Sequence, residues 1–89
     1  MKYVVFYTPA DNVLETAPVH FPAHSARIGE FHQRGDILMV GTFGDPVTQG
    51  SMAIFPTRTA AEKFVEGDPF VLNGVVKSYE IREWDEVLA

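Results

Sequence analysis

The sequence predicts an α+β fold of the split βαβ, or ferredoxin-like, type, in which two helices cover one face of a four-stranded antiparallel sheet. Three observations support it. Short runs of β-branched and aromatic residues are typical of strands, longer stretches carry helix-end signals, and glycine, proline or aspartate separates the two kinds. The order is β-α-β-β-α-β, with strands expected at residues 2–7, 37–43, 51–55 and 75–83 and helices at about 22–34 and 59–67.

The first half of the chain supplies two strands and one helix. The first strand ends at Pro9, and residues 11–16 are expected to form a loop. The helix is expected to begin near Pro22, because a proline is tolerated in a first helical turn, and to end at Gly35. Residues 37–43 and 51–55 then form a hairpin across the polar connection 44–50.

The second helix has signals at both ends. Thr57 or Thr59 is its expected N-cap, and Thr59 with Glu62 matches a capping box. Gly67 and the Asp-Pro pair that follows predict its end. The last strand then closes the sheet, with Trp84 near its end.

Composition limits the classes of function. The 89 residues, 46% of them hydrophobic, predict one domain that spans residues 1–89. A formal charge of −5 with seven scattered Lys and Arg residues argues against nucleic acid as a partner. The absence of cysteine excludes disulfides, thiol nucleophiles and cysteine metal sites. No secretory signal peptide and no apolar run of about 20 residues is found, so we expect no membrane span and a cytoplasmic protein.

The predicted strands are apolar on both faces. A sheet covered by helices on one side only should alternate apolar and polar residues, yet strands 2–7, 37–43 and 51–55 do not. Too few residues remain for another layer, so a second copy of the chain is the simplest cover, and we expect a homodimer through the sheet face. The alternative is that this face forms a pocket for an apolar ligand in a monomer.

His24 and Asp68 are the candidate catalytic residues. His24 shares an apolar helical face with Ile28 and Phe31, and Asp68 opens an Asp-Pro-Phe turn far downstream. A histidine and a carboxylate brought together by folding can move a proton at neutral pH, with the carboxylate orienting the imidazole. The alternative is that His24 is a hydrogen-bonded core residue and Asp68 a turn former.

Other polar residues give weaker patterns. Arg27, one turn after His24, is expected either to bind an anionic group of a substrate or to pair with a surface carboxylate. His20 has the spacing of a metal ligand relative to His24, but Pro22 between them argues against an unbroken helical turn, so no metal site is predicted. No serine has an evident catalytic triad, and the glycines lack the spacing of a phosphate-binding loop.

Several segments together resemble the YciI-like (YCII-related) family. They are 23–28 (AHSARI), Gly35 with 37–41 (ILMVG), and 67–70 (GDPF) with 74–75 (GV). The opening residues 2–5 and the stretch 60–64 also fit, so the resemblance spans nearly the whole chain. Its most specific elements are the inward-facing His24 and the turn at Asp68. The chain departs from the family at Thr42, where a proline usually follows Gly41, and in its short connection between the second and third strands.

The resemblance implies a dimeric α+β barrel of ferredoxin-like protomers, with His24 and Asp68 as an acid/base pair at a cleft. It also implies that one activity in the family eliminates HCl from a chlorinated hydroxyhydroquinone. Thr42 and Phe70 are the expected substrate contacts, Thr42 as a residue that shapes the cleft and Phe70 by stacking.

The first hypothesis is therefore a cofactor-free lyase or isomerase that acts on a small cyclic or aromatic oxygenated molecule. The alternatives are a non-catalytic metabolite-binding or accessory dimer and an oxygenase-like relative on the same barrel.

Overall fold

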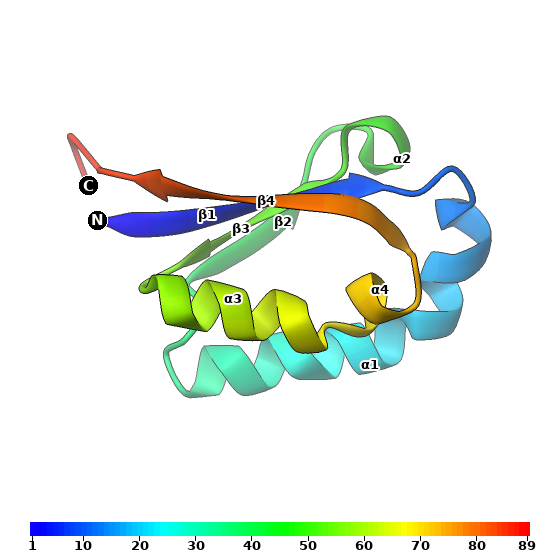
Figure 1. The fold of residues 1–89 in the computed structure, drawn as a ribbon, viewed down its shortest axis with the longest axis horizontal. Helices are drawn as coiled ribbons and strands as arrows, with labels where there is room; N and C mark the ends of the chain where they lie inside the picture. Colours follow the sequence, from blue (N-terminus) through cyan, green and yellow to red (C-terminus); the bar gives the residue numbers. More distant parts are fainter.

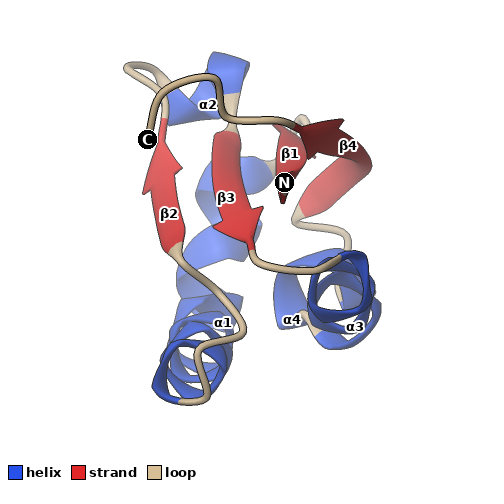
Figure 2. Ribbon diagram, turned by 90° about the vertical axis from the view of Figure 1, so that its left-hand side faces the viewer, coloured by secondary structure: helices blue, strands red, loops and turns tan.

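The computed structural model describes residues 1–89 and has the predicted α+β architecture (Figure 1). The elements are β1 (Lys2–Pro9), α1 (Val13–Gln33), β2 (Met39–Thr42), α2 (Pro46–Gln49), β3 (Ser51–Phe55), α3 (Arg58–Gly67), α4 (Pro69–Leu72) and β4 (Val76–Trp84). The strands pair antiparallel in the order β2-β3-β1-β4. Helices α1 and α3 lie on the same face of this sheet, and the short helix α2 lies at the end of the β2-β3 hairpin (Figure 2).

Helix α1 begins well before the expected start. The predicted loop at 11–16 and the predicted start near Pro22 are both wrong, because α1 runs unbroken from Val13 and contains Pro18 and Pro22. These prolines are exposed and four residues apart, so they share one outer side of the helix. A proline inside a helix leaves the carbonyl four residues earlier without its N–H partner. On this outer side water can satisfy that carbonyl, so the helix persists.

Two short helices, which the sequence analysis did not predict, each begin at an Asp-Pro pair. Asp45 caps α2 by accepting a hydrogen bond from the Val47 N–H, and Asp68 caps α4 by accepting one from the Phe70 N–H. Asp and then Pro are favoured residues at the cap and first position of a helix. The N-cap of α3 is Thr57, whose side chain accepts from the Ala60 N–H at 3.1 Å, so the capping box predicted at Thr59 is wrong.

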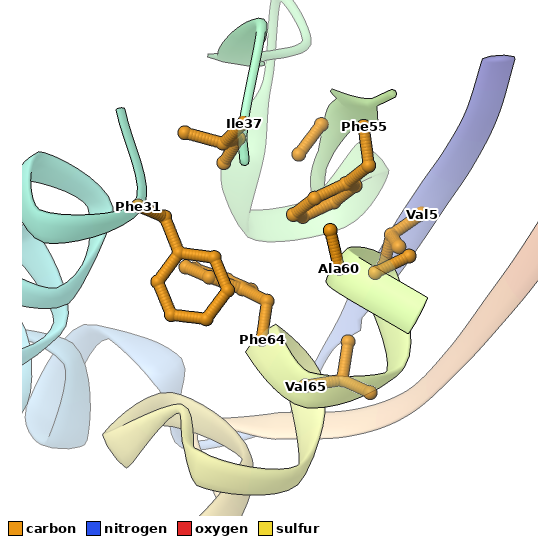
Figure 3. Close-up of a cluster of buried hydrophobic side chains, with 9 residues drawn as sticks. Val5, Phe31, Ile37, Phe55, Ala60, Phe64 and Val65 are labelled. Carbon is orange, nitrogen blue, oxygen red and sulfur yellow. The ribbon is translucent and has the colours of Figure 1, made fainter. Parts of the chain in front are cut away.

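The hydrophobic core lies between the helices and the covered face of the sheet (Figure 3). Phe64 of α3 contacts Phe31 of α1 edge-on, with ring centroids 5.2 Å apart, and Phe55 of β3 at 5.4 Å. These contacts fix α3 against α1 and the sheet. The cluster comprises Val5, Phe31, Ile37, Ala53, Phe55, Ala60, Ala61, Phe64 and Val65.

The open face of the sheet is apolar over β2, β3 and β1. Side chains alternate between faces along a strand, so residues on either side of the core positions Val5 and Ala53 point to the open face. They include Val4, Phe6, Met39, Met52 and Ile54. Over β4 the face becomes polar, where Glu80 and Arg82 form an ion pair. None of the helices is both long and apolar enough to span a membrane.

Candidate active site

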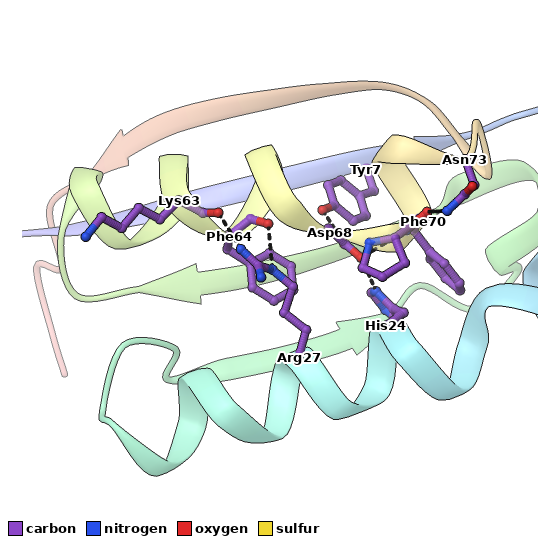
Figure 4. Close-up of polar contacts among 9 residues, drawn as sticks. Tyr7, His24, Arg27, Lys63, Phe64, Asp68, Phe70 and Asn73 are labelled. Carbon is purple, nitrogen blue, oxygen red and sulfur yellow. Dashed lines mark hydrogen bonds and ion pairs between the residues drawn. The ribbon is translucent and has the colours of Figure 1, made fainter.

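Asp68 is a completely buried carboxylate at the junction of α3 and α4. It accepts three hydrogen bonds. The Tyr7 hydroxyl donates to Oδ2 at 2.6 Å, while His24 Nδ1, at 2.7 Å, and the Phe70 N–H, at 3.0 Å, both reach Oδ1 (Figure 4). Because no water reaches this carboxylate, these three groups are what satisfy its charge.

His24 lies on the inner side of α1 and is 9% exposed. An ionised carboxylate only accepts hydrogen bonds, so the contact with Asp68 places a proton on His24 Nδ1. The neutral ring therefore carries its lone pair on Nε2, the nitrogen that a general base uses. Phe70 stacks parallel on the imidazole, with centroids 3.8 Å apart and planes 2° from parallel, and so fixes the plane of the ring.

Tyr7 is the third member of this hydrogen-bonded group and was missed in the sequence analysis. Burial raises the pKa of Tyr7 well above its ordinary value of about 10, and its hydrogen bond to Asp68 and the charge of that carboxylate raise it further. Tyr7 therefore stays protonated and acts as a donor to Asp68. In the sequence Tyr7 is one aromatic residue in an apolar strand, and nothing local distinguishes it from a core residue.

Arg27 holds the end of α3 in place. Its guanidinium donates from Nε to the Phe64 carbonyl at 3.2 Å and from Nη2 to the Lys63 carbonyl at 2.7 Å (Figure 4). It therefore binds two backbone carbonyls near the C-terminal end of α3 and ties α1 to that end of the helix. A Cβ on Gly67 would lie 2.5 Å from Nη2, so any larger residue there would push the guanidinium out of this position.

Neither expectation for Arg27 gains support from this geometry. The structure pairs it with backbone carbonyls, and the expected surface carboxylate partner is not present. Arg27 also does not line the cavity described next, so the prediction that it binds substrate has no structural basis.

A cavity of about 230 Å³ lies between α1 and the sheet, with His24 in its wall. Thr42 and Phe70, the two expected substrate contacts, both line it. Ser51, which the sequence analysis did not single out as a ligand contact, lines it too. The lining residues are Val5, Tyr7, Phe21, His24, Ile28, Val40, Gly41, Thr42, Ser51, Met52, Ala53, Phe64 and Phe70, among them no lysine or arginine.

The unbroken helix puts His20 and His24 one turn apart, contrary to the argument from Pro22. The structure nevertheless assembles no group of three or more His, Asp or Glu side chains that could hold a metal ion.

The comparisons with known proteins decide the family. Residues 1–85 match the YCII-related domain. The chain belongs to the YCII-related family. This YCII-related chain is 28% identical over 97 residues to "Protein YciI" of Escherichia coli O6:H1 and, equally, of Shigella flexneri, with 98% of the chain and 99% of each relative covered.

A solved structure shares the fold of this YCII-related chain. It is 5-chloro-2-hydroxyhydroquinone dehydrochlorinase (TftG) from Burkholderia phenoliruptrix AC1100, in complex with 2,5-dihydroxybenzoquinone. The TM-score is 0.74 at 21% identity, and the match covers 96% of this chain and 94% of that one. This agreement confirms the ferredoxin-like fold.

Proposed function

We propose that this YCII-related protein is a small enzyme of the lyase or isomerase type, in which His24 moves a proton and Asp68 orients it. The proposed substrate is a small cyclic or aromatic oxygenated molecule, and no cofactor is required. The observation that carries the proposal is the 2.7 Å contact between a fully buried carboxylate and a histidine that lines an apolar cavity.

The geometry suits general base catalysis at Nε2. When Nε2 accepts a proton the ring becomes an imidazolium, and the Asp68 charge 2.7 Å from Nδ1 stabilises it. Asp68 cannot turn away, because Tyr7 and the Phe70 N–H hold its two oxygens. Proton transfer of this kind contributes about 10²–10⁴-fold to a rate, which suits a labile substrate.

If the proposed enzyme is a lyase of the dehydrochlorinase type, the reaction that it catalyses is elimination of HCl. In the keto tautomer of the substrate the carbon that bears chlorine is tetrahedral. Nε2 removes the proton of a ring hydroxyl, the electron pair of that O–H bond forms a carbonyl, the adjacent ring double bond shifts to the chlorine-bearing carbon, and chloride leaves with the electrons of the carbon–chlorine bond. The imidazolium then returns its proton to solvent. No oxidant or metal is needed for this balance.

The size of the cavity agrees with a single-ring substrate. A cavity of about 150 Å³ in another protein binds benzene, and the cavity here measures about 230 Å³. The difference leaves room for substituents on one ring. The solved relative with this fold is named as a dehydrochlorinase and was captured with a dihydroxybenzoquinone, a ligand of this size class.

The test compares His24→Gln with His20→Gln, which replaces a histidine on the same helix outside the cavity. With 5-chloro-2-hydroxyhydroquinone as substrate, we expect chloride release by the native protein and by His20→Gln, and a loss of about 10²–10⁴-fold in His24→Gln. Binding of 2,5-dihydroxybenzoquinone should persist in His24→Gln. Equal turnover in all three proteins would rule out His24 as the base.

The second candidate function is a non-catalytic metabolite-binding or accessory module. The observation that favours it is that an apolar cavity with a few polar groups suffices for binding alone. Binding of 2,5-dihydroxybenzoquinone without turnover of any ring tested would support this function.

We also propose that the protein is a homodimer through the open face of the sheet. Support comes from the apolar side chains of β1, β2 and β3 on that face, because exposed apolar patches of this kind mark interfaces. Ile54→Lys places a charge at the centre of the face, whereas Thr59→Lys does so on the exposed side of α3. We expect sedimentation velocity to show a dimer for the native protein and Thr59→Lys, and a monomer for Ile54→Lys.

A further inference from the structure

A row of four hydroxyl side chains crosses the covered face of the sheet. Tyr7 of β1 is the register partner of Tyr79 in β4 and of Ser51 in β3, and Ser51 is the partner of Thr42 in β2. Cross-strand partners share a face, and this is the helix face because Tyr7 lies two residues after the core residue Val5. The row therefore lies on the helix face, and three of its members, Tyr7, Ser51 and Thr42, line the cavity.

The neighbouring row on the same face is apolar. Ile81, Val5, Ala53 and Val40 are register partners across the same four strands. Two of them, Val5 and Ala53, belong to the core cluster. Polar side chains on the sheet side of the cavity are thus confined to the hydroxyl row.

Within the row the hydroxyls differ in their partners. The Tyr7 hydroxyl is bound to Asp68 at 2.6 Å. Ser51 and Thr42 also line the cavity. Their hydroxyls make no side-chain hydrogen bond within the chain, and neither hydroxyl is fully buried. Two adjacent hydroxyls are therefore available to a ligand on the sheet side.

The cavity separates these hydroxyls from His24. Phe21, His24 and Ile28 line it from α1, whereas Ser51 and Thr42 line it from β3 and β2. The imidazole and the two hydroxyl side chains therefore reach the same cavity from different elements.

We infer that Ser51 and Thr42 form the binding position for a substrate oxygen opposite the base, and that they determine specificity. This inference rests on the proposed function and deepens it. The substrate class is a single ring with a hydroxyl or carbonyl oxygen at each of two opposite edges. The cavity offers no lysine or arginine to a phosphate or carboxylate, so rings that carry these groups bind poorly. Thr42 was expected to contact substrate, whereas Ser51 and the pairing of the two hydroxyls come from the structure.

The test measures binding of two probes by NMR titration under nitrogen. Hydroquinone carries oxygens at opposite edges of the ring, and phenol carries only one. The variants are Ser51→Ala and Thr42→Val, which remove a hydroxyl with little change in shape. Ser78→Ala and Thr59→Val are the matched controls, because both residues are exposed and outside the cavity.

We expect hydroquinone to bind the native protein more tightly than phenol and to shift the His24 imidazole resonances. A neutral hydrogen bond contributes about 0.5–1.5 kcal/mol, so each cavity variant should weaken hydroquinone binding roughly 2- to 12-fold. Phenol, which needs only the His24 edge, should lose less than about twofold. The control variants should bind both probes as the native protein does.

Two outcomes overturn the inference, and they are distinguishable. In the first outcome hydroquinone shifts the His24 resonances, but Ser51→Ala and Thr42→Val bind it like the native protein or lose affinity for both probes equally. The hydroxyl pair is then not the binding position, and the proposed function still stands. If neither probe shifts His24 or the cavity amides, ring binding itself fails, and the inference fails with it.

Discussion

Removal of the Tyr7 hydroxyl tests the account of the buried carboxylate most directly. In Tyr7→Phe the ring still fills its place, but Oδ2 of Asp68 loses its only donor. Asp68 is 0% exposed, so water cannot replace that donor without opening the structure. The variant therefore isolates one hydrogen bond to a buried charge.

The expected loss of stability follows from this burial. An unsatisfied buried polar group costs about 1–3 kcal/mol, and more when it is charged. We therefore expect Tyr7→Phe to lower the free energy of unfolding by about 2 kcal/mol, within the range for hydrogen bonds to charged groups. For a domain of this size that corresponds to a fall in Tm of about 8–16 °C.

The assay is urea unfolding followed by far-UV circular dichroism. Tyr79→Phe is the matched control, because Tyr79 is the register partner of Tyr7 on β4 but is 45% exposed. We expect Tyr79→Phe to change stability by less than about 0.5 kcal/mol. In an Asp68→Asn background, Tyr7→Phe should cost less than it does alone, because the unpaired group is then neutral. Equal stability of the two tyrosine variants would refute the reasoning.

The same hydrogen bond predicts a dependence on alkaline pH. The pKa of Tyr7 is higher in the folded protein than in the unfolded chain, so its contribution to stability is complete below about pH 10 and is lost as the pH rises above that value. The tyrosinate absorbance of Tyr7 should therefore appear only together with unfolding. In Tyr7→Phe this component should be absent, and the decline in stability above about pH 10 should be smaller.

Two further predictions concern the supports of the site. Gly67→Ala should lower the free energy of unfolding in urea by about 1–2 kcal/mol, because the new Cβ displaces the Arg27 guanidinium from the end of α3. The control is Gly29→Ala, which has nothing near its Cβ and should raise the free energy of unfolding by about 0.5–1 kcal/mol. Equal effects of the two substitutions would contradict the role given to Arg27. In Asp68→Asn the chemical shifts of the His24 imidazole should change at constant pH, because the carboxylate that contacts Nδ1 at 2.7 Å is gone; unchanged shifts would show that the two side chains are not in contact.

The sequence predicted the order and approximate positions of the strands because local patterns encode them. Runs such as 2–7 and 51–55 carry β-branched and aromatic residues between turn residues, and the structure has strands there. The prediction failed at the start of α1, where local rules treat a proline as a boundary. Pro18 and Pro22 are tolerated because their side of the helix faces solvent, and the orientation of a helix is a tertiary property.

The residues of the candidate site were likewise predicted only in part from the sequence. His24 was identified because it is a polar residue on an apolar helical face, and Asp68 because it begins an Asp-Pro turn. The structure brings these two side chains into contact. Tyr7 and Arg27 could not be assigned from the sequence, because each depends on partners on other elements. Tyr7 reaches Asp68 across 61 positions of the chain, and Arg27 reaches the end of α3 across 36 or more.

The sequence by itself therefore determined the fold class, the apolar character of both sheet faces, and His24 and Asp68 as the candidate pair that the structure brings into contact. Only the tertiary structure decided that Tyr7 and the Phe70 N–H complete the hydrogen bonding of Asp68, and that Ser51 and Thr42 are register partners in the wall of the cavity that His24 also lines. The physical reason is that residue spacing along the chain sets local periodicity and capping, whereas burial, register between strands and the approach of distant helices are set by packing of the whole domain.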